Sequence, residues 1–398
     1  MSKSNYKPLG KYIQPVIGRN GDLGELPLMG LSISKKFIPS IANTIGTDMS
    51  TYRIIEKNQF AYGPVTSRNG DKITIALFND YEKALISQAY IPFEVKNSSE
   101  LDPEYLMMWF RRPEFDRYAR FKSHGSAREI FDWDEMCNTL LPVPSITKQR
   151  EIVKEYNVVQ NRIALNQQMI KKLEETAQAV YRRWFVEFEF PDAEGKPYKS
   201  NGGEMVWCEE LGKEVPKGWE IGKMEDVTKI IMGQSPDGES YNTEGIGTPL
   251  INGPVEFGDY FTNRSKWTTS VTKLSEVGDL IICVRGSTTG RYVKSDGRYC
   301  IGRGVCSFRA KHSQTFVDLL YKNNINKLLS YTTGSTFPNW DGQTLANYPI
   351  IVPRKAVIKA FETKVNAIIK YIENLSMELE FTIKMKDLLL SKLATIEN

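Results

Sequence analysis

The residue types that carry most enzyme catalysis are few and scattered in this sequence. It contains two histidines, His124 and His312, and neither has cysteine, histidine or carboxylate neighbours at the spacing of a metal site. A GxxxxGK[ST] phosphate-binding loop is absent, and Gly302-Arg303-Gly304 lacks the third glycine of a dinucleotide-binding turn. We therefore predict that this chain has no catalytic residues, binds no metal and holds no cofactor.

Two short strings look like parts of nucleic-acid-modifying sites but do not meet their requirements. Residues 191–196 spell a PD…ExK nuclease signature, with Asp192 and Glu194 close together in a Gly/Pro-rich linker. Metal-dependent nucleases instead bring such carboxylates together on one cation from separate strands. Asn347-Tyr348-Pro349-Ile350 has the wrong order for the Asn/Asp-Pro-Pro-aromatic tetrad of base methyltransferases. The sequence supports neither a stand-alone nuclease nor a stand-alone methyltransferase.

Cationic and polar residues gather in short segments with turn-forming residues. Arg, Lys, Asn, Gln, Ser and Thr reach the phosphates and base edges of DNA, so these segments are candidate DNA contacts, with a solvated loop as the alternative for each. In the first half the candidates are Arg19, Asn20, Lys35, Lys36, Ser67, Arg68, Asn69, Lys122, Ser123, His124 and Arg128. In the second half they are Gln234, Ser235, Asn252, Arg264, Lys266, Arg285, Ser287, Thr288, Arg291, Arg303 and Ser335.

The composition is that of an ordinary globular protein with a mildly basic balance. A chain of 398 residues is long enough for two or three domains. The net charge of +4 permits a polyanionic partner without requiring one. Five cysteines without a CxxC pair indicate reduced thiols. The polar segment from Met1 to Lys7 and the lack of a long apolar run predict neither a signal peptide nor a membrane span, and hence a cytoplasmic protein.

Two long helical stretches dominate the pattern. Residues 145–190 contain no Gly or Pro, and apolar residues recur there at steps of four and three from Ile152 to Trp184, with Asn166 filling the one gap. This spacing is the heptad rhythm of a helix seam. Adding 209 to each position gives a second seam that begins at Phe361, again in a stretch free of Gly and Pro. On the seam, Asn166 is expected to fix the register at some cost in stability.

The offset of 209 extends beyond the helices. Val143-Pro144 corresponds to Val352-Pro353, and near the two starts Leu9-Gly10-Lys11 resembles Ile221-Gly222-Lys223 at an offset of 212. Two unrelated domains that each end in a helix would not share an offset. The matches therefore predict an internal duplication, in which each half is a β domain followed by a long helix.

Short β-branched and aromatic runs, separated by Gly, Pro, Asn and Asp, occupy the regions before each long helix and predict strands. The predicted fold class is α+β, with two β-rich domains and two long coiled-coil helices in a pseudo-two-fold repeat. The predicted parts are a first β-rich domain (1–144), a central helix (145–190), a linker (191–218), a second β-rich domain (219–352) and a C-terminal helix (353–398).

Several motifs, in this order along nearly the whole chain, resemble the specificity (S) subunits of type I restriction–modification systems. They are residues 141–153, 191–198, 216–220, 224–227, 233–236, 249–255, 278–281 and 285–290. The first half departs from the family pattern at one place. Ala61-Tyr62-Gly63-Pro64 stands where a Gly-Asp-hydrophobic strand and an Arg-Gly loop are expected.

The resemblance implies two target-recognition domains, each of which reads one half of a split DNA site. It also implies that the two long helices pack antiparallel as a spacer and dock two methyltransferase subunits, to which restriction subunits are added. Catalysis would lie in those partner subunits, which would use S-adenosylmethionine and ATP with magnesium. A helix of about 40 residues rises about 60 Å, which suits a spacer between two base-reading domains on one duplex.

The sequence thus favours a non-catalytic DNA-recognition subunit that reads a bipartite site and directs methyltransferase and restriction subunits to it. Two alternatives remain open. A coiled-coil adaptor that binds only proteins would explain the helices but not two strand-rich domains with cationic loops. A specificity subunit of a related modification system outside type I would share the same features.

Overall fold

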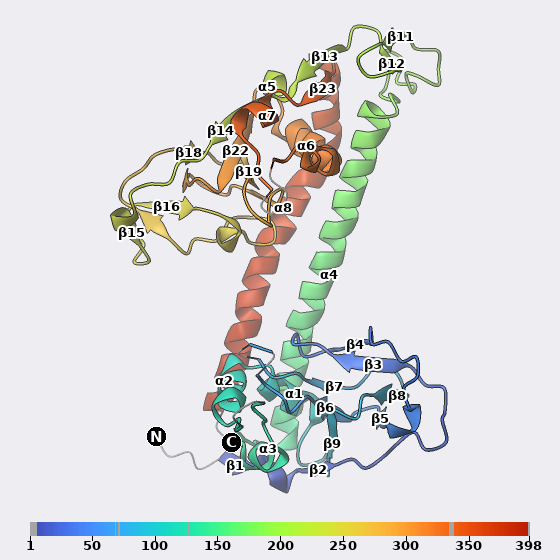
Figure 1. Cartoon of the computed structure of the whole chain (residues 1–398), viewed down its shortest axis with the longest axis vertical. Helices are drawn as coiled ribbons and strands as arrows, with labels where there is room; N and C mark the ends of the chain where they lie inside the picture. The colour runs from blue at the N-terminus through green and yellow to red at the C-terminus, as the bar shows by residue number, and fades with distance from the viewer. Residues whose placement is uncertain (1–5, 68, 71, 126–127, 334–337, 397–398) are drawn as a thin grey trace. The chain divides into compact units, whose positions relative to one another are not determined.

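The computed structural model describes residues 6–67, 69–70, 72–125, 128–333 and 338–396. Its contacts divide the chain into two compact units, unit 1 (residues 1–164 and 381–398) and unit 2 (residues 165–380). The chain passes from one unit to the other within helix α4 (Ile146–Phe185) and again within helix α8 (Lys355–Lys392) (Figure 1). Each unit therefore contains part of both long helices, a grouping that differs from the five predicted parts.

Unit 1 combines three small sheets with short helices. Its antiparallel four-stranded sheet has the order β2 (Ile13–Pro15), β9 (Ile91–Val95), β6 (Phe60–Tyr62) and β7 (Ile75–Leu77). Its mixed sheet has the order β4 (Phe37–Pro39), β3 (Leu28–Leu31), β8 (Lys83–Ile86) and β5 (Arg53–Glu56), and β3 and β8 are parallel. The third sheet pairs β1 (Tyr6–Pro8) with β10 (Leu140–Pro142). The helices are η1 (Leu9–Lys11), η2 (Met49–Thr51), α1 (Pro103–Phe110), α2 (Pro113–Phe121), α3 (Trp133–Asn138) and the C-terminal η5 (Leu393–Thr395).

Aromatic packing holds the helices of unit 1 on its antiparallel sheet. Phe60 and Phe93 stack with their ring centroids 4.9 Å apart, and Phe110 of α1 meets both rings edge-on. Helix α1 begins here because Asp102 caps it by accepting two backbone N–H groups and Pro103 supplies the first helical residue. Burying such rings is the main stabilising term available to a small β-rich core.

Unit 2 contains the same kinds of sheet. Its antiparallel sheet has the order β14 (Thr228–Met232), β22 (Val305–Ala310), β19 (Leu280–Cys283) and β20 (Tyr292–Lys294). Its mixed sheet has the order β15 (Tyr241–Asn242), β17 (Trp267–Thr268), β16 (Thr248–Ile251), β21 (Tyr299–Ile301) and β18 (Leu274–Ser275), and β16 and β21 are parallel. Two further pairings join β13 (Glu220–Lys223) to β23 (Pro349–Val352) and β11 (Met205–Cys208) to β12 (Lys213–Pro216). The helices are α5 (Met224–Val227), η3 (Gly238–Ser240), η4 (Pro254–Glu256), α6 (Gln314–Leu329) and α7 (Gly342–Ala346).

The two units repeat one topology, which confirms the predicted duplication. Each has an antiparallel four-stranded sheet, a mixed sheet with one parallel pair, and a two-stranded pairing whose second strand leads into a long helix. Helix α4 begins at Ile146 and helix α8 at Lys355, which are equivalent positions at the predicted offset. Helices α3 and α7 begin after Asp132 and Asp341, and each aspartate accepts the N–H of the residue three positions later.

The predicted match of residues 9–11 with residues 221–223, at an offset of 212, is wrong. The Leu9 N–H donates to the Thr139 carbonyl (2.8 Å), and the Met224 N–H donates to the Tyr348 carbonyl (2.9 Å). Thr139 and Tyr348 are equivalent positions, because they directly follow the corresponding residues Asn138 and Asn347. Leu9 therefore corresponds to Met224 and not to Ile221. The shared Gly-Lys pair that suggested 212 lies on a 3-10 helix in unit 1 and on strand β13 in unit 2.

The long helices pair antiparallel, as expected from the resemblance. In unit 2 the Trp184 and Phe185 rings at the end of α4 lie 5.6 and 4.9 Å from the Phe361 ring near the start of α8. In unit 1 Tyr156, near the start of α4, shares a buried cluster with Leu390 at the end of α8. No helix within the described ranges is long and apolar enough to cross a membrane.

Helix α4 ends at Phe185 rather than at the predicted residue 190. Phe188 takes a left-handed φ of 64°, which an α-helix cannot contain. Its ring meets Trp219 edge-on at 5.6 Å, and Phe190 stacks on the same indole at 5.0 Å. Packing against Trp219 therefore outweighs continuation of the helix.

Asn166 lies on the seam of α4 within unit 2. Its side chain is completely buried, and neither amide atom has a hydrogen-bond partner among the described residues. We expect Asn166→Leu to raise the free energy of unfolding by about 1–3 kcal/mol, because a buried unpaired amide costs about that much. Urea unfolding would measure it.

The matched control is Gln167→Leu at the neighbouring exposed position, which should change stability by less than about 0.5 kcal/mol. Lower stability of Asn166→Leu would contradict the prediction. A changed oligomeric state or site spacing would instead support the expected role of Asn166 in fixing the register.

Candidate nucleic-acid interface

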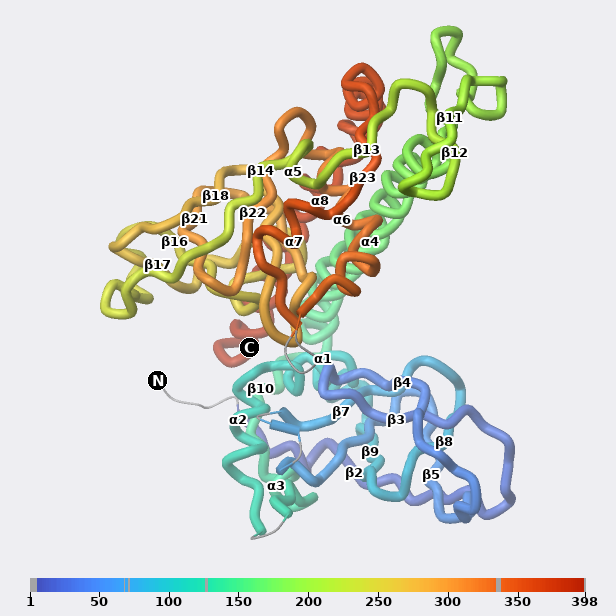
Figure 2. The backbone as a smooth tube through the Cα atoms, turned by 45° about the horizontal axis from the view of Figure 1, so that its top comes forward, coloured from blue at the N-terminus to red at the C-terminus, as the bar shows by residue number. Residues whose placement is uncertain are grey.

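Three loops of unit 2 converge at one end of its sheets. They follow β14 (residues 233–236), follow β16 (residues 252–253) and join β21 to β22 (residues 302–304) (Figure 2). The Gln234 N–H donates to the Ile301 carbonyl (2.9 Å), and the Arg303 N–H donates to the Ser235 hydroxyl (3.2 Å). The Gly302 N–H donates to the Ile251 carbonyl at the end of β16 (2.8 Å). Hydrogen bonds therefore fix these loops to one another, and we call the group the unit 2 loop cluster.

Glycine makes the close approach of these loops possible. A Cβ on Gly302 would lie 1.8 Å from Oδ1 of Asn252, and one on Gly304 would lie 2.2 Å from the Asn252 carbonyl oxygen. The GxG element of the sequence therefore serves packing against Asn252. Oδ1 of Asn252 is buried and has no hydrogen-bond partner among the described residues.

A fourth loop, residues 285–291 after β19, joins the cluster. The Val284 N–H donates to the Gly304 carbonyl (2.9 Å), and the Gly286 N–H donates to the Pro338 carbonyl (3.0 Å). Gly286 and Gly290 have left-handed φ values of 81° and 93°, so the turn requires residues without a side chain. Tyr321 supports the loop from the core by donating its hydroxyl to the Gly290 carbonyl (2.9 Å).

The exposed side chains of the cluster are cationic and polar. Gln234, Arg285, Ser287, Arg291 and Arg303 are exposed. Within the described part of the chain, none of the three arginines forms an ion pair. Free guanidinium groups on a backbone held by hydrogen bonds are suited to phosphates and to guanine edges.

Three other predicted residues of unit 2 already have partners. The Arg264 guanidinium donates to the Tyr299 hydroxyl (3.1 Å), which raises the pKa of Arg264, and it lies 3.6 Å from Asp296. The Lys266 ammonium lies over the Tyr241 ring, 5.6 Å from its centroid. Thr288 is half-buried, and its carbonyl accepts the Arg291 N–H. These residues are less available to DNA than the exposed arginines.

The repeat identifies the corresponding loop of unit 1. Strand pairing sets Phe60 opposite Phe93 in unit 1 and Leu280 opposite Phe308 in unit 2, so the loop after β6 corresponds to the loop after β19. Counted from Phe60 and Leu280, Ser67 corresponds to Ser287. The position of Arg285 is held by Val65 in unit 1, directly after the departure from the family pattern at residues 61–64.

In unit 1 a second segment lies against this loop. The Thr66 hydroxyl donates to the Ser123 hydroxyl (2.8 Å), which donates to the Ala119 carbonyl (2.7 Å). Ser67 is exposed, and the Asn69 amide donates to the Val65 carbonyl (3.2 Å). The loop after β6 and the segment from residue 122 therefore form one surface, as the four loops of unit 2 do.

The remaining candidates of this segment are spread over its surface. Lys122 and His124 lie 3.4 and 3.8 Å from the Glu135 carboxylate. Arg128 is exposed. Arg68 and Ser335 lie outside the described residues.

In the ranges that the structure describes, His, Cys, Asp and Glu form no group of three that could hold a metal.

Lys35 and Asn20, two of the predicted DNA contacts, are buried in the interior of unit 1. The Lys35 ammonium lies 2.7 Å from Asp116 and donates to the Phe110 carbonyl, and burial lowers the pKa of Lys35. The Asn20 side chain is 3% exposed, accepts the Gly24 N–H (2.9 Å) and holds a turn. Residue type alone could not separate them from their exposed neighbours Arg19 and Lys36.

A sequence model of one protein family matches most of the chain. Its description is "Type I restriction modification DNA specificity domain", and it matches residues 1–175 and 216–385. The two matched segments correspond to the two halves of the structural repeat.

Individual relatives and one solved structure are similar over long stretches. The chain is 26% identical over 305 residues to the putative type I restriction enzyme MjaX specificity subunit of Methanocaldococcus jannaschii, covering 75% of this chain and 69% of the relative. It is 23% identical to the HindI specificity subunit of Haemophilus influenzae, covering 91% of each. The crystal structure of the type I restriction-modification system S subunit from M. genitalium has the same fold (TM-score 0.59, 13% identity, 99% of this chain and 96% of that one).

The Lys35–Asp116 pair yields a stability prediction. We expect Lys35→Met to lower the free energy of unfolding by about 3–5 kcal/mol, because it leaves the Asp116 carboxylate buried without its cation. Chemical denaturation would measure the change. Lys36→Met, next to it and exposed, is the control and should stay within about 0.5 kcal/mol of the parent chain. Equal effects of the two substitutions would contradict the interior role of Lys35.

Proposed function

We propose a function for this chain from the premise that it belongs to the type I restriction-modification DNA specificity family, whose model covers both of its halves. Its function is DNA sequence recognition, and it is not the catalytic component of such a system. In more detail, we propose that units 1 and 2 each read one half of a bipartite DNA site.

The observation that carries the bipartite reading is the unit 2 loop cluster together with its counterpart in unit 1. Both surfaces lie on loops that follow equivalent strands, and both expose polar residues at matching positions, such as Ser67 and Ser287. Different side chains on the same scaffold, such as Val65 and Arg285, would let the two units read different sequences. A repeated scaffold with divergent loops is therefore suited to an asymmetric split site.

Within the unit 2 loop cluster the side chains would have different roles in DNA binding. Exposed Arg285 and Arg303 would reach guanine edges or phosphates, since a guanidinium can donate two hydrogen bonds to either. The carboxamide of Asn252, whose Oδ1 is buried beside Gly302, would be a positioning group. The glycines would let backbone and base approach each other closely.

We also propose that the long helices bind methyltransferase subunits. In unit 1 the outer face of α8 exposes Phe381, Met385 and Leu388, which share one side of the helix at spacings of four and three. Phe381 and Leu388 are 63% and 61% exposed, which is costly for large apolar side chains without a partner. Restriction subunits would join this complex, and the partners would supply S-adenosylmethionine, ATP and magnesium chemistry.

The overall test is to mix the purified chain with its candidate methyltransferase subunit and with duplex DNA. A complex with two methyltransferase subunits and salt-sensitive, site-specific DNA binding is the expected result. Assembly without DNA binding would favour the protein-only adaptor. Methylome sequencing of a host with and without the gene would identify the modified site and would test the alternative of a related modification system.

We expect Arg285→Ala to relax recognition of one half-site at a cost of about 1–3 kcal/mol in specific binding. Ser67→Ala, in the corresponding loop of unit 1, should affect the other half-site only. Binding to DNA panels with single-base changes in each half would measure both variants. A uniform loss over all sequences, with a weaker dependence on salt, would make Arg285 a phosphate contact instead.

For the helices, we expect the double substitution Phe381→Ser and Leu388→Ser to weaken methyltransferase binding about tenfold or more, because two exposed apolar anchors are removed. Calorimetric titration of the chain with the methyltransferase subunit would measure this. Asp387→Ser, exposed on α8 but on another side of the helix, is the control. Unchanged binding by the double variant would place the docking surface elsewhere.

A further inference from the structure

A short antiparallel pairing joins the loop after β6 in unit 1, and the loop after β19 in unit 2, to a second segment. In unit 1 Val65 lies opposite Ile130, and in unit 2 Arg285 lies opposite Asn339. Ile130 and Asn339 are equivalent positions at the offset of 209. The two pairings therefore occupy the same place in the repeat, and we call them the unit 1 loop pair and the unit 2 loop pair.

The hydrogen bonds around the two loop pairs are also equivalent. In unit 1 the Phe131 N–H donates to the Pro64 carbonyl (2.8 Å). In unit 2 the Trp340 N–H donates to the Val284 carbonyl (2.9 Å). Residues directly opposite each other in an antiparallel pairing point to the same side, with Cβ atoms about 4.5–5.5 Å apart. The two side chains of each loop pair therefore lie together.

Each loop pair faces away from the core of its unit. Phe131 and Trp340, which follow Ile130 and Asn339, are 0% and 1% exposed. Neighbouring residues of an extended segment point to opposite sides. Ile130 therefore points outward and is 41% exposed, and Val65 opposite it is half-buried.

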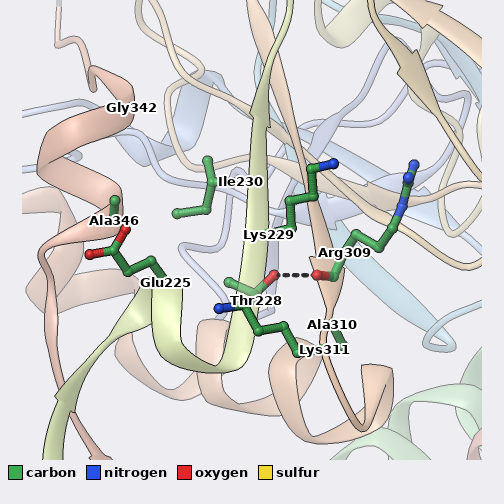
Figure 3. Close-up of a pocket in the computed structure, with 9 residues that line it drawn as sticks. All are labelled: Glu225, Thr228, Lys229, Ile230, Arg309, Ala310, Lys311, Gly342 and Ala346. Carbon is green, nitrogen blue, oxygen red and sulfur yellow. Dashed lines mark hydrogen bonds between the residues drawn. The ribbon is translucent and has the colours of Figure 1, made fainter.

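The segments that carry the loop pairs are anchored to the rest of each unit. The Trp340 indole N–H donates to the Leu328 carbonyl (3.0 Å), and α7 begins directly after Asp341. Figure 3 shows α7, with Gly342 and Ala346, beside the edge strand β14. Helix α3 of unit 1 follows its paired segment in the same way. Rigid anchoring of this kind holds recognition side chains in place.

The two loop pairs differ in chemistry. The unit 2 loop pair carries a guanidinium and a carboxamide, whereas the unit 1 loop pair carries only hydrocarbon side chains. Its neighbours on the same two segments, Ser67 and Arg128, are exposed and polar or cationic. In the major groove of DNA the apolar group that a hydrocarbon side chain can contact is the 5-methyl group of thymine.

We propose that Val65 and Ile130 recognise thymine 5-methyl groups in the half-site that unit 1 reads. This assignment deepens the proposed function and rests on it, because it assumes that unit 1 binds DNA. The repeat then supports two kinds of base recognition on one scaffold. Unit 1 uses apolar contact, and unit 2 uses hydrogen bonds from Arg285.

The place of the unit 1 loop pair favours DNA over a protein partner. Its equivalent in unit 2 belongs to the unit 2 loop cluster, where the exposed guanidinium groups suit DNA. Two hydrocarbon side chains cover a methyl group, but they are far smaller than the apolar centre of a stable protein interface. The exposed cations Lys72 and Arg128 on the same two segments are complementary to phosphates.

The first test changes only the DNA. The protein is the full chain in complex with its candidate methyltransferase subunit, and the probe is a duplex with the site that methylome sequencing identifies. The half-site of unit 1 is the one whose recognition Arg285→Ala leaves unchanged. Replacing its thymines with uracil removes only the methyl groups, and we expect each contacted methyl to contribute about fourfold in affinity. Uracil in the spacer between the half-sites is the control and should leave the affinity unchanged.

The second test changes only the protein. We expect the double substitution Val65→Ser and Ile130→Ser to weaken binding of the thymine duplex about tenfold, because the apolar contact is lost. The double variant should also bind the thymine and uracil duplexes equally. Ile41→Ser is the control, since Ile41 is 99% exposed in the loop after β4. That loop lies at the opposite end of the mixed sheet from the loop after β3, because the two strands are antiparallel.

The outcomes are distinguishable. Equal affinity of the unaltered complex for the thymine and uracil duplexes overturns the assignment, and so does a unit 1 half-site without thymine. Loss of methyltransferase binding by the double variant, with an unchanged free energy of unfolding, also overturns it and makes the loop pair a protein contact. If the unaltered complex shows no site-specific DNA binding, the proposed function itself fails.

Discussion

The packing of α4 against α8 is the interaction on which the rest of the structure depends. Trp184, Phe185 and Phe361 bury the seam in unit 2, and Tyr156 and Leu390 share a buried cluster in unit 1. Because each unit takes part of both helices into its contacts, neither β-rich half can be removed without exposing helix surface of the other half. The two helices therefore bury a structural core along their seam and also form the covalent connections between the two units.

The hydrogen-bond register of the paired strands shows which residues of the two units are equivalent, and this helps to assign their functions. It aligns loops whose sequences no longer match, such as those around Ser67 and Ser287, and shows where the same backbone carries different chemistry. The close approach of Gly302 to Asn252 and the left-handed turn at Gly286 show that glycine shapes the unit 2 loop cluster while its polar side chains remain exposed. Recognition loops can diverge in this way on a shared framework of strands.

Periodicity predicted the long helices and the duplication because both reflect repeated burial over many residues. The α+β class and the antiparallel helices followed from that pattern and from the family resemblance. Local chemistry was less predictable. Lys35 and Lys36 are neighbours of one type, yet only the first is buried against Asp116, a residue far away in sequence. The match at an offset of 212 failed because so short a string cannot fix a register.

The first and last described segments of the chain meet in unit 1, where the Tyr6 hydroxyl donates to the Ala394 carbonyl (2.8 Å) and Leu393 joins the core near β10. Unit 2 is one continuous segment, whereas unit 1 is assembled from the first and last parts of the chain. During synthesis on the ribosome, all of unit 2 therefore emerges before unit 1 can be completed. The half of the protein made first is the last to acquire its full core.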